Sequence, residues 1–233
     1  RYQNNLLTLK GGVNLHYFTT MPGEVGKSGK DSNITPSQMP RKSLWDAALY
    51  AEANYKFLPR FLLNAGVRLS VLHAPASAYY AAKTFVMPEP RAELSFIPNA
   101  SHRFSASYTQ AAQSIHMLTT SSVGIPSDMW MPANALLKPS VMRQLALGYE
   151  YNFPDKEYTL SLEAYMRRTS HVVDYRKNAD IFQNDWIEDE VETGSARGCG
   201  LEFYLSKNKG AVTGWISYTL SRARNRIGGE EYR

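Results

Sequence analysis

Hydrophobic and polar residues alternate with a period of two along most of the chain. In 61–72 the odd positions from Phe61 to Val71 are apolar, whereas the even positions include Asn64 and Arg68. This period is typical of β-strands that have one apolar face. The same alternation predicts nine strands, at 6–18, 44–57, 61–72, 91–96, 103–109, 144–153, 158–167, 200–206 and 212–220. No segment keeps a helical period for more than two turns, so the sequence predicts an all-β chain.

The connections between these strands are alternately long and short. The short turns are 58–60, 98–101, 154–157 and 208–210, and the long loops are 19–43, 73–89, 111–140 and 176–193. Strict alternation predicts an antiparallel up-and-down sheet, with every short turn at one end and every long loop at the other.

Strand length and aromatic placement favour a membrane barrel over a soluble sheet. Most of the strands have about 9–14 residues, more than the ~5–6 of soluble sheets and close to the ~9–11 that cross a bilayer when tilted. A rim of aromatic residues occupies the apolar positions beside the short turns: Tyr55, Phe57, Phe61, Phe96, Phe104, Tyr151, Phe153 and Tyr158. Such a rim is typical of a lipid–water interface. The predicted fold is therefore an antiparallel up-and-down transmembrane β-barrel.

Each strand then has a lipid-facing and a lumen-facing side. The residues predicted to face lipid include Leu49, Val67, Leu94, Leu147, Leu162 and Leu205. The polar residues predicted to face the lumen are Glu52, Arg68, Arg91, Glu93, Arg103, Glu150, Glu163, Arg167 and Glu202. They either form ion pairs that keep a wide interior polar, or contact a plug domain or a passing substrate.

Nine strands are an unusual number for a complete barrel. Bacterial single-chain barrels have even strand numbers, and an open sheet edge is not tolerated in lipid. We therefore expect residues 1–233 to form part of a single β-barrel domain within a longer protein.

The composition mainly excludes other classes of protein. With 43% hydrophobic and 20% charged residues the chain is not expected to be disordered. Its single cysteine, Cys199, excludes a disulfide scaffold. No apolar run is long enough for a transmembrane helix, and the first residues lack the pattern of a signal peptide. The net charge of +5 is spread along the chain without a nucleic-acid motif, so no nucleic-acid partner is predicted.

Loop 111–140 is the strongest candidate for a binding segment. No Asp, Glu, Lys or Arg occurs from Phe104 to Ser127, and four large adaptable side chains lie in the loop: Met117, Met129, Trp130 and Met131. They predict either a substrate- or partner-contacting surface at the mouth of the barrel, or a loop packed over that mouth.

Catalytic and metal chemistry is not predicted. Loop 176–193 is acidic but lacks the spacing of a calcium loop, so we expect it to be solvated. The segment from Gly23 to Lys30 lacks the glycine spacing of a phosphate-binding loop. The five histidines lie on different segments without ligand spacing. The sequence therefore predicts no enzyme, no metal and no cofactor.

Several motifs together resemble one family, the TonB-dependent outer-membrane receptors of the Bacteroidetes type. They are Gly200-Leu-Glu-Phe203 followed by Gly214-Trp-Ile-Ser-Tyr-Thr-Leu-Ser221, Glu89-Pro-Arg-Ala-Glu-Leu-Ser95, the loop from Ser121 to Pro132, and Leu147-Gly-Tyr-Glu150 with Leu162-Glu-Ala-Tyr165. The resemblance covers 89–222. It implies a 22-stranded barrel in the outer membrane, surrounded by lipid, of which this chain holds about nine strands.

The resemblance also implies a mechanism and partners. The family has an N-terminal plug domain with a TonB-box, and we expect neither within residues 1–233. Through that region the TonB complex drives uptake of a nutrient that is captured by the extracellular loops, in some cases with a surface lipoprotein as a further partner. Two alternatives stay open at this point: a passive porin-like outer-membrane channel and a soluble β-sandwich adhesin module.

Overall fold

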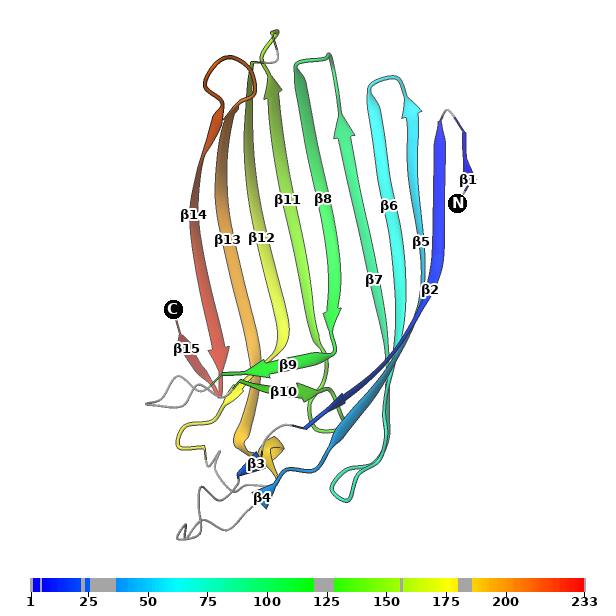
Figure 1. Ribbon diagram of the computed structural model, residues 1–233, viewed down its shortest axis with the longest axis vertical. Helices are drawn as coiled ribbons and strands as arrows, with labels where there is room; N and C mark the ends of the chain where they lie inside the picture. The colour runs from blue at the N-terminus through cyan, green and yellow to red at the C-terminus, as the bar shows by residue number, and fades with distance from the viewer. Residues whose placement is uncertain are drawn as a thin grey trace.

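The chain folds into one large antiparallel sheet, shown in Figure 1 as a computed structural model that describes residues 2–4, 6–21, 24–25, 37–119, 128–155, 157–179 and 186–232. The sheet has 11 strands in the order β1-β2-β5-β6-β7-β8-β11-β12-β13-β14-β15. Nine strands are long: β2 (Leu7–Thr20), β5 (Lys42–Leu58), β6 (Phe61–Ala74), β7 (Lys83–Phe96), β8 (His102–Gln113), β11 (Ser140–Asn152), β12 (Tyr158–Tyr175), β13 (Val191–Lys207) and β14 (Gly214–Ile227). The nine predicted strands are thereby confirmed, with β1 (Tyr2–Gln3) and β15 (Glu230–Tyr232) as short additions at the edges.

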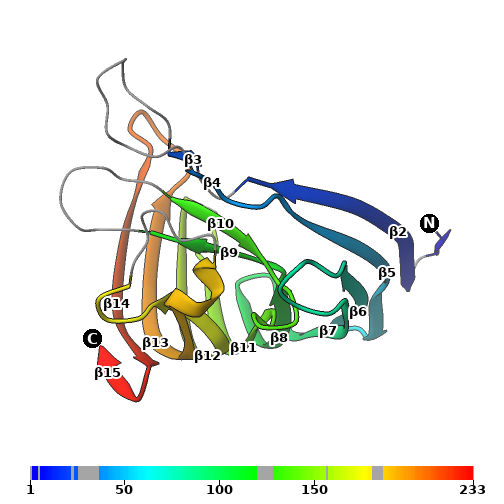
Figure 2. The same cartoon turned by 90° about the horizontal axis from the view of Figure 1, so that it is seen from below.

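The sheet is curved like the wall of an open barrel (Figure 2). Two small two-stranded sheets accompany it: β9 (Ile115–Leu118) with β10 (Met129–Pro132), and β3 (Glu24–Val25) with β4 (Ser37–Gln38). The β9–β10 hairpin lies on the concave side, where β9 contacts β12 and β10 contacts β2 and β5. A single curved sheet of this size differs from the two face-to-face packed sheets of a β-sandwich. No helix in the described part of the chain is long and apolar enough to span a membrane.

The up-and-down topology is confirmed. The four short turns lie at the upper end in Figure 1, and the long loops, with β9, β10 and the 3₁₀ helix η1 (Ile187–Glu190), lie at the lower end. We call these the turn end and the loop end. All four long loops are shorter than predicted, because the strands continue farther toward the loop end than the alternation indicates.

The largest difference concerns 73–89, where only 75–82 lies outside the strands. The first half of β7 was not predicted because it contains two prolines, Pro88 and Pro90. Proline has no N–H to donate to a sheet ladder, and β7 pairs with β6 along its whole length but with β8 only from Arg91 onward. Side chains bridge the unpaired part: Gln110 Nε2 donates to the Pro88 carbonyl at 2.7 Å, and the Glu89 carboxylate accepts from the Ala112 N–H at 3.1 Å.

Strand register places the predicted lipid-facing residues on one face, which is the convex one. One cross-strand row runs Leu94–Ala106–Leu147–Ala164–Leu201–Leu220 from β7 to β14. Large apolar side chains on this face are exposed in the isolated chain, and Leu147 is 65% accessible. Without a covering layer, such a face is what a lipid-embedded barrel wall requires.

A continuous aromatic belt occupies the turn end of the convex face. Ring centroids are 5.7 Å apart for Phe57 and Phe61, 4.8 Å for Phe61 and Phe96, and 6.3 Å for Phe96 and Phe104. Phe104 continues the belt to Tyr149 at 5.0 Å. At the loop end, Tyr17 and Trp45 form a second aromatic contact at 4.6 Å. The convex face therefore has an aromatic group at each end, as the two interfaces of a membrane barrel do.

Two glycines on the concave face allow tyrosine rings to lie flat on the sheet. A Cβ at Gly12 would lie 2.6 Å from the Tyr50 hydroxyl oxygen, and one at Gly200 would lie 2.8 Å from the Tyr165 ring. Each ring covers the backbone that its glycine leaves bare, so any larger residue at Gly12 or Gly200 would displace it.

Candidate functional site

The β9–β10 hairpin divides the four predicted contact residues between its two faces. Trp130 pairs with Met117, whereas Met129 pairs with Leu118 and Met131 with His116. Because successive side chains of a strand point to opposite faces, Met117 and Trp130 share one face. Both are about half exposed, at 48% and 51%. They form an apolar pair that we call the Met117–Trp130 pair.

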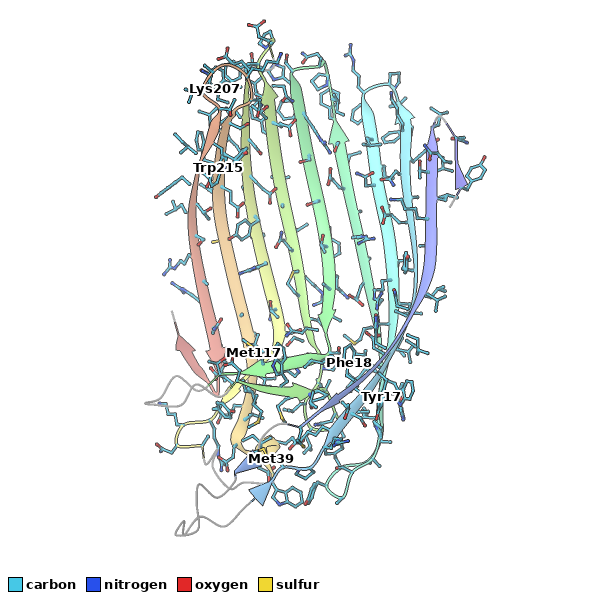
Figure 3. The ribbon with its side chains drawn as sticks, in the orientation of Figure 1. Tyr17, Phe18, Met39, Met117, Lys207 and Trp215 are labelled. Atoms are coloured by element: carbon cyan, nitrogen blue, oxygen red, sulfur yellow. The ribbon has the colours of Figure 1, made fainter. Side chains whose placement is uncertain are left out.

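The opposite face of the hairpin is the core of the loop end. Met129 and Met131 are buried, at 7% and 0% accessibility, in a cluster with Met39, Leu118, Leu137 and Ile187. Met39 lies close to β4, below the hairpin that carries Met117 (Figure 3). The prediction that Met129 and Met131 belong to the contacting surface is therefore corrected, because both thioethers pack inside the loop end.

A buried ion pair ties this core to the sheet. Lys42, at the start of β5, pairs with Glu188 of η1, and both side chains are less than a tenth accessible. Asn134 Nδ2 donates to the same carboxylate at 3.0 Å. Burial and the nearby Glu188 carboxylate raise the pKa of Tyr80, which lies in the β6–β7 loop. Four segments distant in sequence thus meet around one carboxylate.

The acidic loop is only partly as expected. Asp180 and Asp185 lie outside the described residues, but the side chains of Glu188 and Glu190 are buried. Glu190 accepts from Arg176 Nε at 2.8 Å. The prediction of a solvated loop is therefore wrong for these two carboxylates, whose cations come from β5 and from the start of the loop. No cluster of potential metal ligands occurs among the described residues.

His116 secures the hairpin from its buried side. Its ring is 4% accessible, and Nε2 donates to the Lys138 carbonyl at 3.0 Å. Burial lowers the pKa of His116, and the nearby His171 acts in the same direction. The ring is thus held neutral inside the loop end.

The concave face of the sheet carries a ladder of ion pairs. Arg91 pairs with Glu52 at 2.7 Å, and Arg103 pairs with Glu93 at 2.9 Å. The side chains of Glu52, Arg91 and Glu93 line a cavity of about 200 Å³. Arg68 lies farther toward the loop end, where Nη1 donates to Asn14 at 2.8 Å and Nε lies 3.7 Å from the Glu89 carboxylate.

The remaining predicted lumen residues also lie on the concave face but are less completely paired. Glu150 is the cross-strand neighbour of Arg103 and accepts from Asn152 at 2.8 Å. Arg167 lies opposite Gly198. Glu163 and Glu202 are direct cross-strand neighbours, an arrangement of like charges that is unfavourable without a cation nearby.

The comparisons with known proteins agree with this architecture. Residues 2–232 match the family model described as "TonB dependent receptor-like, beta-barrel". The chain belongs to the TonB-dependent receptor β-barrel family. This family consists of outer-membrane receptors and transporters, not enzymes. No curated protein sequence matches the chain.

Solved structures show the same fold at low sequence identity. The FrpB iron transporter from Neisseria meningitidis, as apoprotein, is 14% identical with a TM-score of 0.63, covering 97% of this chain and 35% of its own. The siderophore receptor PiuA from Acinetobacter baumannii is 16% identical with a TM-score of 0.60, and the match covers 100% of this chain and 38% of PiuA. The copper transporter OprC is 14% identical with a TM-score of 0.62, and the match covers 96% of this chain and 38% of OprC. The chain therefore spans little more than a third of these TonB-dependent receptors.

Sequence reasoning missed Lys42, Glu188 and Asn134. Lys42 lay at the boundary of a predicted loop, and Glu188 was one of several acidic residues with no signal to distinguish it. Asn134 stands between two alanines and carries no pattern at all. Their association depends on how the loops fold over the concave side.

Proposed function

We propose that this chain is part of the barrel of an outer-membrane TonB-dependent receptor of the Bacteroidetes type. The whole receptor captures a nutrient at its extracellular loops and takes it up across the outer membrane, with energy supplied by TonB through a plug domain. Family membership and the motifs between Glu89 and Ser221 support this function. Structural neighbours named as iron, siderophore and copper transporters support an uptake role.

The observation that carries the proposal is the position of the Met117–Trp130 pair. The hairpin that bears it crosses the concave side at the loop end, and long loops of outer-membrane barrels are extracellular. Its other face is fixed by the buried core around Met131. An exposed indole and thioether on a rigid support suit an apolar or aromatic part of a ligand.

The carboxylates of the concave face are proposed to meet the plug. Glu163 and Glu202 are adjacent like charges on the wall of the lumen. A cationic group of the plug domain would neutralise both, whereas the complete pairs Arg91–Glu52 and Arg103–Glu93 need no further partner. A surface lipoprotein that covers the loop end is a further proposed partner.

Uptake by the full-length receptor tests the function. A strain in which it is the sole receptor is offered a panel of ferric catecholate, copper, cobalamin and oligosaccharides, with and without functional TonB. We expect one substrate to be taken up only with TonB, and uptake to fall in Trp130→Ala. The control is Trp45→Ala, which removes an exposed indole from the convex face. Uptake that persists without TonB would instead identify a passive channel.

A further inference from the structure

The buried side of the β9–β10 hairpin meets the sheet wall through three polar residues. His116 of β9 is 4% accessible, and Ser140 at the start of β11 is 7% accessible. His116 Nδ1 lies 3.5 Å from Ser140 Oγ, which donates to the His171 carbonyl of β12 at 2.6 Å. These three residues join the hairpin to two strands of the sheet, and we call them the His116–Ser140–His171 cluster.

His116 has a ring nitrogen that receives no hydrogen bond. Its Nε2 donates to the Lys138 carbonyl at 3.0 Å, so Nδ1 of the neutral ring carries a lone pair. A hydroxyl has one hydrogen, and that of Ser140 is already donated to the His171 carbonyl. His116 Nδ1 therefore has no donor in Ser140. It is a buried acceptor that can bind a proton and then donate it to Ser140 Oγ.

His171 has an unusual backbone conformation at the other end of the cluster. It is the extra residue of a β-bulge between the paired residues Ser170 and Val172, and its φ is 56°. Residues with a Cβ rarely adopt this left-handed conformation, and such outliers are concentrated at functional sites. Its Nδ1 is buried without a hydrogen-bond partner among the described residues. The cluster thus contains two buried imidazole nitrogens that receive no proton from a donor.

The charged groups on the surrounding segments are engaged with one another. The ion pairs are Lys42 with Glu188, Arg176 with Glu190, and His16 with Asp46. On β12 the Asp174 carboxylate accepts from the Tyr175 N–H at 2.8 Å. The side chain of Lys138 is exposed. Burial lowers the pKa of His116, and His171 is the group whose charge adds to this effect.

We propose that the His116–Ser140–His171 cluster is a proton-operated latch, which holds the hairpin closed while both rings are neutral and releases it when they bind protons. Protonation of both rings places two positive charges in one buried cluster, where they repel and lack solvation. In the open hairpin both rings reach water, which stabilises their charged forms. Acid therefore favours the open hairpin.

The role of the latch rests on the function proposed above. The hairpin carries the Met117–Trp130 pair on its other face, so its release changes the surface that is offered to a nutrient at the mouth of the barrel. A histidine that is neutral in the closed hairpin and has the ordinary pKa of about 6.5 in the open one shifts the opening equilibrium by up to about tenfold between pH 7.5 and 5.5.

Thiol accessibility in the full-length receptor measures this opening. In a background with Cys199→Ser and no other cysteine, Ala133→Cys places a thiol directly after β10, at a position that is 0% accessible. The small probe 4,4′-dithiodipyridine should reach it only when the hairpin opens. Dividing its reaction rate by that of Lys138→Cys, at an exposed position, removes the intrinsic pH dependence of thiol chemistry. We expect this ratio to rise by about five- to tenfold from pH 7.5 to 5.5.

Histidine variants assign the rise to the cluster. His171→Asn removes a titratable ring while asparagine tolerates the left-handed conformation, so the rise should become smaller. It should be absent in H116N/H171N. The matched control is His16→Asn, which removes an exposed histidine from a strand that contacts β10 and should keep the full rise.

Several outcomes would overturn the latch. They are a flat ratio in the receptor with both histidines, a full rise in His171→Asn or in H116N/H171N, and an equal loss in His16→Asn. Heat-modifiable migration in electrophoresis checks that every variant is folded. TonB-dependent uptake by a receptor with a flat ratio would overturn this inference alone. A hairpin that responds to pH in a protein without TonB-dependent uptake would overturn the proposed function alone.

Discussion

Residues at odd and even positions of one strand have opposite surroundings in this protein. Leu147 is 65% accessible on the convex face, and Glu150 lies on the concave face beside Arg103. Replacing Leu147 with Arg should destabilise the assembled barrel by about 2–4 kcal/mol if the site lies near the bilayer midplane. Glu150→Gln should assemble normally, because the lumen is polar. The folded fraction of both variants in the outer membrane, compared side by side, measures this difference, and equal assembly would contradict the assignment of the faces.

Met131 and Trp130 are also neighbours with different roles. Met131→Ala leaves a hole in the loop-end core, and burial at 0% accessibility predicts a loss of about 2–5 kcal/mol. Trp130→Ala removes a half-exposed ring and should change stability by no more than about 0.5 kcal/mol. Denaturant unfolding of the full-length receptor separates the two. A large loss for Trp130→Ala would mean that its indole serves packing and not ligand contact.

At the scale of elements, the loop end is held together by a few buried polar contacts. Lys42 and Glu188 join β5 to η1 with little solvent access. Removing one partner leaves the other as an unpaired buried charge. Lys42→Met and Glu188→Gln should therefore each lower the free energy of unfolding by about 3–5 kcal/mol. The double variant Lys42→Met/Glu188→Gln should cost less than the sum of the two single losses. Additive losses in a double-mutant cycle would show that the two side chains do not interact.

The hairpin should respond to pH through His116. Its pKa is lowered in the folded state by burial, so the opened hairpin binds a proton more readily than the folded one. The stabilisation is complete above the ordinary value of about 6.5 and declines as pH falls below it toward the lower folded-state pKa. The protection factors of the amides in 115–118 and 129–131, which correct for the intrinsic pH dependence of exchange, should therefore decrease as the pH falls from 7.5 to 5.5. His116→Asn should abolish that dependence, whereas His73→Asn, at an exposed ring, should keep it.

Alternation alone was enough to predict the centres of the nine strands, but not their loop-side halves. Pro88 and Pro90 look like loop residues although β6 pairs with both, and Arg143, Arg168 and Arg197 broke the apolar parity that defined the strand limits. Those arginines share the convex face with the apolar residues and lie toward the loop end. The β9–β10 hairpin was missed for another reason: both of its faces carry apolar residues, so no polar side marks the period.

At the scale of the whole molecule, every feature depends on one orientation. The turn end carries the aromatic belt, the convex face is apolar, and the loop end carries the folded core and the Met117–Trp130 pair. In the proposed receptor the loops are outside the cell, the turns are in the periplasm and the convex face is in lipid. The concave face then surrounds the plug. Glu163 and Glu202 lie outside the ion-pair ladder and are the carboxylates proposed to contact the plug.

Cysteine labelling of the full-length receptor in intact cells tests that orientation most directly. In a Cys199→Ser background, single cysteines replace Lys138 at the loop end, Leu147 on the convex face and Lys209 at a short turn. A membrane-impermeant maleimide should label only the cysteine at 138, a bilayer-soluble probe only that at 147, and neither should reach 209 until the outer membrane is opened. Surface labelling at 209 with protection at 138, or aqueous labelling at 147, would contradict the account.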